Sequence, residues 1–172
     1  MGASLGNTDN HLWEMKNGYV LATEKVLIEI TKVFGSATDS EIDDLRKLLR
    51  IGVQWNTEVT LSDSKHTVTQ IYCSVLPVAY SPQLPPRLWE GFSRIVLEAS
   101  YEASLCAGIL NFHNTGNNKI YLTLVGGGAF GNDIRWIMDA MTRSLDRYKN
   151  VGLDVIIVSF RSSSVHVQEL IY

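Results

Sequence analysis

The chain has 172 residues, of which 45% are hydrophobic and 19% are charged, and its net charge is −3. This composition is typical of one globular domain and excludes fibrous and disordered chains. The small negative charge and the scattered Lys and Arg residues argue against DNA or other nucleic acids as partners. No apolar stretch of the sequence reaches the roughly 18 residues that cross a bilayer, so we expect a soluble protein with no membrane partner.

The first quarter of the chain is predicted to contain a loop and two helices. The first twenty residues are rich in Asn, Asp and Gly, which predicts a long loop. Apolar residues at helical spacing predict a helix over 21–33, which Gly35 ends. A second helix is predicted over 40–50, because acidic residues gather at its start and basic residues at its end.

The middle of the chain is predicted to form a β-hairpin and a long helix. Residues 53–61 and 67–75 are rich in strand-forming side chains and flank the turn-like segment 62–65, so they are expected to pair, the second as a buried strand. A proline-rich stretch then precedes an amphipathic helix over 88–110. Residues 114–118 have the composition of a loop.

The last third of the chain has the pattern strand, loop, helix, strand. The expected elements are a strand over 120–125, a helix over 134–148 and a strand over 155–160. A crossover of this kind joins parallel strands that helices cover. We therefore expect the α/β class with three layers, α/β/α, in a single domain over 1–172. Because no strand precedes the opening loop, a fragment of a longer chain is an alternative.

The two cysteines, Cys73 and Cys106, lie in apolar segments, which is typical of buried structural thiols. Neither has a second cysteine or a histidine at metal-ligand spacing, so no metal site is predicted. Unpaired thiols of this kind fit a reducing, intracellular compartment such as the cytoplasm.

The segment between the predicted strand 120–125 and the predicted helix 134–148 carries three successive glycines, Gly126, Gly127 and Gly128. Glycines let the backbone adopt positive φ and approach a ligand closely. The amides of these residues and of Ala129, Phe130, Gly131 and Asn132 can converge on phosphate oxygens, and the N-terminus of the following helix attracts the anion. The alternative is a connection that only packs helix against strand. No lysine follows the glycines, so the kinase-like and dinucleotide motifs are not matched.

The stretch from Ile120 to Asp133 resembles the second substrate loop of macrodomains, which in the poly(ADP-ribose) glycohydrolase-like branch ends in Gly-Ala-Phe-Gly-Asn. The segment 75–80 is similar to the strand end that reads Val-Gly-Pro in that family. The chain thus resembles a divergent branch of the ADP-ribose-binding macrodomains, near the glycohydrolase-like and MavL-type ADP-ribosylhydrolases. The resemblance implies a three-layer α/β/α arrangement around a mixed sheet.

A second, more degenerate match lies near the N-terminus. Asn7, Thr8, Asp9 and Asn10, followed by the segment 16–19, resemble the first macrodomain loop, which reads Asn-Ala-Ala-Asn and then Gly-Gly-Gly. The Gly-Gly-Gly-x-Glu-Glu signature of the glycohydrolases does not occur in the sequence. Cleavage of poly(ADP-ribose) chains is therefore not expected.

The resemblance implies ADP-ribose, or an ADP-ribosylated protein such as ubiquitin, as the ligand, with no cofactor. Phe130 would lie against the distal ribose or anchor its own loop, and Phe160 would stack on adenine or fill the core. Asn132 or Asp133 is also expected to cap the following helix. The ligand-binding residues implied by the two loops are Asn7, Asn17, Gly18, Tyr19, Gly126, Gly127, Gly128, Ala129, Phe130, Gly131, Asn132 and Phe160.

Hydrolysis of the bond at the anomeric carbon develops oxocarbenium character, which a carboxylate stabilises. Asp9 is the first candidate for this catalytic role and Glu14 is its nearby partner, unless both are solvated loop residues. The leading hypothesis is a hydrolase that removes ADP-ribose from a modified protein. The alternatives are a non-catalytic reader of ADP-ribose and a domain that has lost the ligand.

Overall fold

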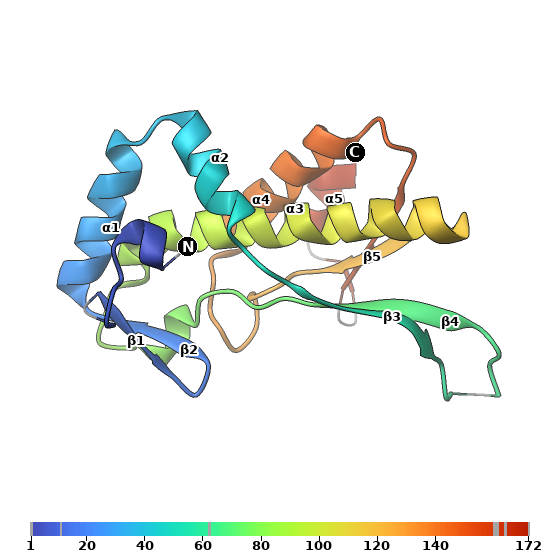
Figure 1. The fold of residues 1–172 in the computed structure, drawn as a ribbon, viewed down its shortest axis with the longest axis horizontal. Helices are drawn as coiled ribbons and strands as arrows, with labels where there is room; N and C mark the ends of the chain where they lie inside the picture. The colour runs from blue at the N-terminus through green and yellow to red at the C-terminus, as the bar shows by residue number, and fades with distance from the viewer. Residues whose placement is uncertain (1, 11, 62, 160–161, 164, 172) are drawn as a thin grey trace.

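The computed structural model describes residues 2–10, 12–61, 63–159, 162–163 and 165–171. It is a mixed α/β structure, about 48% helix and 19% strand, and so confirms the predicted class (Figure 1). In chain order its elements are η1 (Ala3–Leu5), β1 (Trp13–Lys16), β2 (Tyr19–Ala22), α1 (Glu24–Ser36), α2 (Asp39–Lys47), β3 (Gly52–Glu58), β4 (Thr67–Tyr72), η2 (Val78–Tyr80), η3 (Pro86–Leu88), α3 (Glu90–Thr115), β5 (Lys119–Thr123), α4 (Ile134–Tyr148), β6 (Asp154–Val158) and α5 (Val165–Ile171).

The strands in the described part of the chain form three separate two-stranded sheets. β1 and β2 are antiparallel, as are β3 and β4, which confirms the predicted hairpin of β3 and β4. β5 and β6 are parallel, with Lys119 opposite Asp154 and Thr123 opposite Val158. α4 is the crossover between them, so the predicted order of strand, loop, helix and parallel strand is confirmed, although both strands begin one residue and end two residues before their predicted limits.

The core lies along α3, which runs along the long axis of the molecule in Figure 1. Trp89 at its start and Leu97 and Leu105 within it are fully buried, together with Ile137 and Met141 of α4. Burying a large apolar side chain contributes roughly 1.5–3 kcal/mol. The packing of α3 against α4 therefore supplies much of the stability that holds the connecting loops in place.

The opening segment is not the long loop that its composition predicts. Residues 13–16 and 19–22 pair as β1 and β2, and the connecting residues Asn17 and Gly18 have φ of 51° and 83°. Positive φ at both positions is typical of the tight turn that matches the twist of a hairpin. Because β2 occupies residues up to Ala22, α1 begins at Glu24, after the predicted residue 21, with Thr23 as its N-cap.

The predicted second helix is confirmed as α2, which ends at Lys47 and not at residue 50, and the charges at its two ends act as expected. Thr38 and Glu41 form a capping box, and the hydrogen bonds from the Thr38 backbone and side chain lower the pKa of Glu41. Asp43 accepts hydrogen bonds from Arg46 at 2.6 Å and from Arg143 of α4 at 3.0 Å. This carboxylate therefore links α2 to α4.

β4 and α3 differ from their predicted boundaries. β4 ends at Tyr72, and most of its side chains are exposed, so the predicted buried strand over 67–75 is wrong. The reason is that only one face of the strand, with Thr69 and Ile71, is turned toward α3 and the core, and both of these side chains are only partly buried. α3 continues to Thr115, through the start of the loop expected over 114–118. The short helix α5 had no counterpart among the predictions.

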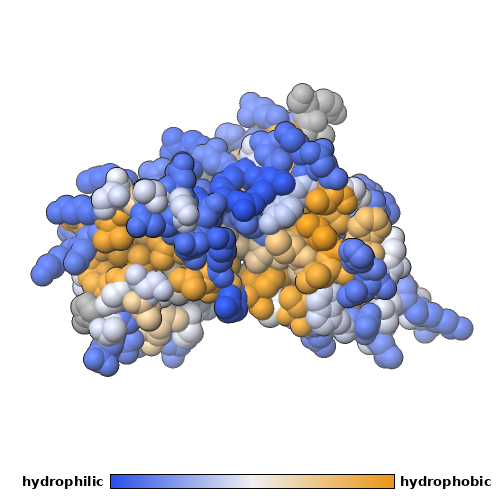
Figure 2. Space-filling view, turned by 45° about the horizontal axis from the view of Figure 1, so that its top comes forward, coloured by the Kyte–Doolittle hydropathy of each residue, from blue (hydrophilic) through white to orange (hydrophobic). Residues whose placement is uncertain are grey.

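The molecular surface is not uniformly polar. On the face in Figure 2, the apolar surface lies in two areas that a hydrophilic band separates. Trp55 of β3 and Leu110 of α3 are among the exposed apolar side chains, and they line a hollow of about 370 Å³ between α2, β3 and α3. None of the helices in the described ranges has both the length and the apolar character that crossing a bilayer requires.

Candidate functional site

The glycine loop, Val125–Asn132, adopts a conformation that only glycine fits at two positions. Gly126 has φ of 81° and Gly131 has φ of 67°. A Cβ atom at Gly126 would lie 2.3 Å from Cγ2 of Val75, and one at Gly131 would lie 2.8 Å from Cβ of Ala79. The two glycines therefore allow the loop to pack directly against the segment 75–80.

Four amides of this loop, that of Gly126 included, donate to no acceptor among the described residues. Gly127, Gly131 and Asn132 donate their amides to carbonyl groups within the loop or just before it, at 3.0–3.2 Å. The amides of Gly128, Ala129 and Phe130 donate to no acceptor among the described residues. Gly128 and Ala129 are exposed. Consecutive free amides of a loop are an arrangement that can bind anions such as phosphate.

Two buried side chains hold this loop. The Tyr101 hydroxyl donates to the Thr123 carbonyl at 2.8 Å and accepts from the Val125 amide at 3.1 Å, and its burial raises the pKa of Tyr101. The Asn132 amide nitrogen donates to the carbonyl of Leu76 at 2.9 Å. The same nitrogen donates to the carbonyl of Gly126 at 3.3 Å. The loop is thus fixed both to α3 and to the segment 75–80.

Asp133, directly after the loop, is the N-cap of α4. Its carboxylate accepts from the Arg135 amide at 2.9 Å and from the Arg135 guanidinium at 2.6 Å. The side-chain hydrogen bond from Arg135, followed by that from its backbone, lowers the pKa of Asp133 to about 2. Of the two predicted caps, Asp133 takes this role and Asn132 does not.

We expect Asp133→Ala to lower the free energy of unfolding by about 1 kcal/mol at neutral pH, because the helix loses its cap. The folded-state pKa lies below the ordinary value of 3.8. The stabilisation is therefore complete above that value and is lost as the pH falls through about 2. In urea unfolding, the difference in the free energy of unfolding between wild type and Asp133→Ala should become smaller as the pH is lowered from 6 to 3. Asp133→Asn is the control that keeps an acceptor oxygen, and a difference that stays constant with pH would contradict the assignment.

An aromatic cluster of Tyr19, Tyr80 and Phe130 joins the β1–β2 hairpin to the glycine loop. The ring centroids are 5.1 Å apart for Tyr19 and Tyr80, 5.8 Å for Tyr19 and Phe130, and 5.5 Å for Tyr80 and Phe130, all edge to face. Burial, and then the neighbouring Tyr19, raise the pKa of Tyr80. The structure thus brings the two predicted loops together and adds Tyr80, which the sequence analysis missed.

A cavity of about 410 Å³ lies beside this cluster, under the hairpin. Its wall includes Tyr19 of the aromatic cluster, as well as Val75 and Leu76, which contact the glycine loop. No Asp, Glu, Lys, Arg or His is among the described residues that line it. The lining residues are Gly2, Asn7, Trp13, Met15, Gly18, Tyr19, Val20, Leu49, Ser74, Val75, Leu76, Pro77, Phe92 and Val96.

The structure gives a folding role to three predicted ligand-binding residues at or near this cavity, Asn7, Asn17 and Gly18. The Asn7 side chain accepts from the amides of Leu12 and Trp13 at 2.9 and 3.2 Å, and so folds the N-terminal segment onto the hairpin. Asn17 and Gly18 form the hairpin turn, and Gly18 also lines the cavity. These three residues therefore hold the N-terminal segment and the hairpin turn in place beside the cavity.

The two predicted catalytic carboxylates are not among the described residues that line the cavity. Asp9 is exposed in a turn and has φ of 52°. Glu14 is exposed on β1 between Trp13 and Met15, both of which line the cavity. Because neighbouring side chains of a strand point to opposite faces, Glu14 points away from the cavity. Phe160, the predicted adenine contact, lies outside the described residues.

The described residues give little support to a cysteine nucleophile or to a metal site. Cys73 and Cys106 are free and half-buried, and burial raises the pKa of Cys73, so its thiol is poorly suited to act as a nucleophile. Within the ranges that the structure describes, no three His, Cys, Asp or Glu side chains gather as metal ligands.

Comparisons with known proteins found no similarity: no family model matches the chain, and neither does any curated protein or solved structure. The properties of the site therefore rest on its own residues and geometry.

Proposed function

We propose that this protein is an ADP-ribose-binding module of the macrodomain type that reads ADP-ribosylated protein, with ubiquitin as one candidate. The observation that carries the proposal is the run of three amides, at Gly128, Ala129 and Phe130, that have no acceptor among the described residues. They lie in the loop that leads into α4, whose own N-terminus is capped by Asp133, so the amides of the loop supply the donors for a diphosphate. A single three-layer domain in the reducing cytoplasm is part of the same proposal, and the free thiols agree with it.

The cavity under the hairpin supplies the second half of such a site. ADP-ribose combines a doubly charged diphosphate with an aromatic base and two riboses, so it needs anion-binding amides beside a largely apolar pocket. The contacts of Val75 and Leu76 connect the glycine loop to this cavity. Tyr19 provides an aromatic wall next to Phe130. Phe130 remains our candidate for the contact with the distal ribose.

Binding is better supported than hydrolysis. A hydrolase needs a carboxylate close to the anomeric carbon. The cavity has no acidic residue among its described lining, and Asp9 and Glu14 are exposed elsewhere. The reader, which needs only the amides and the pocket, is therefore the function that we propose.

The test is the removal of one free amide. Ala129→Pro deletes an N–H that donates to no described acceptor, at a position where φ is not positive, so little stability should be lost. In titration calorimetry with ADP-ribose, we expect affinity to fall at least tenfold, about 1.4 kcal/mol, because one phosphate hydrogen bond is lost. Ala129→Ser keeps the amide and should bind like the wild type.

Two outcomes would contradict the proposal. The first is the absence of saturable heat when wild-type protein is titrated with millimolar ADP-ribose, and the second is equal affinity of Ala129→Pro and wild type. Release of ADP-ribose from a mono-ADP-ribosylated protein by the wild type, lost in Asp9→Ala, would replace the reader with a hydrolase.

A further inference from the structure

α2 is attached to the rest of the molecule with little apolar packing. None of its nine residues, all of which the structure describes, is buried, and its apolar residues Ile42 and Leu45 are only half-buried. A hollow of about 370 Å³ lies between the C-terminal end of α2, β3 and α3, so apolar side chains do not fill this interface. Isolated helices of fewer than about 12 residues are marginal in water. α2 therefore depends on other contacts to stay folded in its place.

The main contacts of α2 are ionic. Asp43 accepts hydrogen bonds from Arg46 at 2.6 Å and from Arg143 of α4 at 3.0 Å. A third guanidinium group, that of Arg147 on α4, lies 3.6 Å from the same carboxylate. Arg46 also donates to Glu98 of α3 at 2.7 Å. These side chains are between 15% and 43% exposed, so salt screens them less than fully exposed pairs. We call this set of side chains the Asp43 network.

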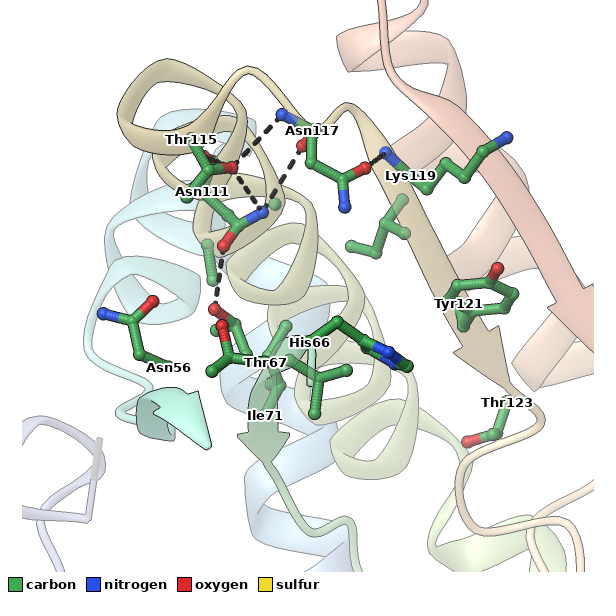
Figure 3. A pocket seen from close by; sticks show the side chains of 15 residues that line it. Asn56, His66, Thr67, Ile71, Asn111, Thr115, Asn117, Lys119, Tyr121 and Thr123 are labelled. Carbon is green, nitrogen blue, oxygen red and sulfur yellow. Dashed lines mark hydrogen bonds between the residues drawn. The ribbon is translucent and has the colours of Figure 1, made fainter. Parts of the chain in front are cut away.

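The two helices that hold α2 are themselves fixed. Leu105 of α3 and Ile137 of α4 are fully buried in the core that joins these helices. The C-terminal end of α3 is tied to the turn before β5, because Asn111 donates to the carbonyl of Asn117 at 3.4 Å (Figure 3). Loss of the Asp43 network therefore releases α2 and leaves α3 and α4 in place.

One carboxylate keeps like charges of two helices together. Arg46 belongs to α2, whereas Arg143 and Arg147 belong to α4. Without the charge of Asp43, these guanidinium groups repel one another across the contact. Removing one partner of a partly buried ion pair is unfavourable because the other partners stay charged. Neutralising Asp43 should thus be enough to release α2.

α2 reaches the cavity under the hairpin through Leu49. The amide of Leu49 donates to the carbonyl of Arg46 at 3.1 Å, so the backbone of Leu49 follows the end of α2. The Leu49 side chain is half-buried and lines both the cavity under the hairpin and the hollow beside α3. It is therefore a wall between these two spaces, and its position depends on α2.

We propose that α2 controls the ligand cavity under the hairpin through the Asp43 network. With the network intact, Leu49 forms its part of the cavity wall. When the network breaks, Leu49 leaves with α2 and the wall opens. The control acts on the ADP-ribose site and so rests on the proposed function. Because such coupling is reciprocal, a ligand in the cavity also holds α2 in place.

Hydrogen exchange of the segment 38–51 tests the network without a ligand. In Asp43→Asn we expect its amides to exchange about tenfold faster than in the wild type, because the released helix is too short to stay folded. Asp44→Asn is the matched control, since Asp44 is 68% exposed and pairs with Lys47 of the same helix. It should exchange like the wild type. Asp43→Glu keeps the charge and should restore most of the protection.

The reaction of Leu49→Cys with a maleimide tests the movement of the wall. Leu49 is half-buried, so the introduced thiol should react slowly, and adding Asp43→Asn should speed its reaction about tenfold. Mass spectrometry of the peptides separates this thiol from Cys73 and Cys106. Adding Asp44→Asn in place of Asp43→Asn should leave the rate unchanged.

Calorimetry tests the consequence for the ligand. We expect Asp43→Asn to bind ADP-ribose about fivefold more weakly than the wild type and Asp44→Asn to bind equally, and ADP-ribose should slow exchange of the segment 38–51. Unchanged exchange or unchanged labelling with Asp43→Asn would overturn the proposal, and so would faster labelling with equal affinity. If the wild type binds no ADP-ribose, the proposed function fails, while the labelling of Leu49→Cys still decides whether the Asp43 network holds the wall.

Discussion

Replacing Gly126 with alanine should destabilise the protein by about 3 kcal/mol and should abolish ADP-ribose binding. Gly126 has φ of 81°, where an alanine is strained. The added Cβ would also lie 2.3 Å from Cγ2 of Val75 and 2.8 Å from the side-chain nitrogen of Asn132. Relieving these contacts has to move the loop, and the amides that we assign to the diphosphate move with it.

Gly128→Ala is the matched control for this substitution. No atom lies within 4 Å of the Cβ position at Gly128, and its φ is not in the left-handed region. We expect its free energy of unfolding to stay within about 0.5 kcal/mol of the wild type. Urea denaturation measures the change in stability of each variant, and titration calorimetry measures its binding of ADP-ribose. Equal stability of the two variants would show that the packing of Gly126 against Val75 is not as described.

Replacing Asn132 with alanine should lower the free energy of unfolding by about 2 kcal/mol. The side chain is 5% exposed, and its amide nitrogen serves the carbonyls of Leu76 and Gly126. Removing it leaves both carbonyls short of a donor in a buried place. Its own oxygen has no partner among the described residues, so the loss of that unsatisfied acceptor offsets part of the cost.

Asn118→Ala is the control, because that exposed amide also donates to a backbone carbonyl, of Gly152 at 2.9 Å. Water replaces the lost donor there, so we expect a change of less than about 0.5 kcal/mol. Chemical denaturation of both variants checks the comparison. If Asn132→Ala and Asn118→Ala cost the same, Asn132 does not link the glycine loop to the segment 75–80 in solution.

The C-terminal third of the fold was predictable because its signals are local. In α4 the apolar residues repeat at helical spacing and Asp133 caps the first turn, so the predicted limits, Ile134 and Tyr148, match the structure. The alternation of buried and exposed residues in β5 is likewise readable from Lys119 to Thr123. The glycine loop between them follows from the same local pattern.

The sequence also contains an indication of the N-terminal hairpin, but the polar, glycine-rich composition of the segment favours a loop instead. Asn17-Gly18 between short runs of apolar residues is a strong indication of a two-residue hairpin turn. The two strands have only four residues each, so their stability depends on distant contacts. One such contact is Trp13 against Phe92 of α3, with centroids 5.3 Å apart, and no local pattern reveals it.

The candidate site could be predicted in part for the same reason. The glycine loop is contiguous in sequence, whereas the aromatic cluster requires residues 19, 80 and 130 to meet through tertiary packing. Glu14 is a catalytic candidate only if residues 13–16 form a loop, in which any side chain can turn toward a ligand. Once residues 13–16 form a strand, the orientation of Glu14 follows from that of Trp13.

The β3–β4 hairpin has a consequence for the dynamics of the molecule. It is a two-stranded unit with mostly exposed side chains, tied to α3 through Thr69 and Asn111, and two strands alone are only marginally stable in water. Its opening therefore requires much less free energy than unfolding of the α3–α4 core. The molecule should behave as two cooperative units of unequal stability, in which the hairpin opens and closes many times during the lifetime of one folded core.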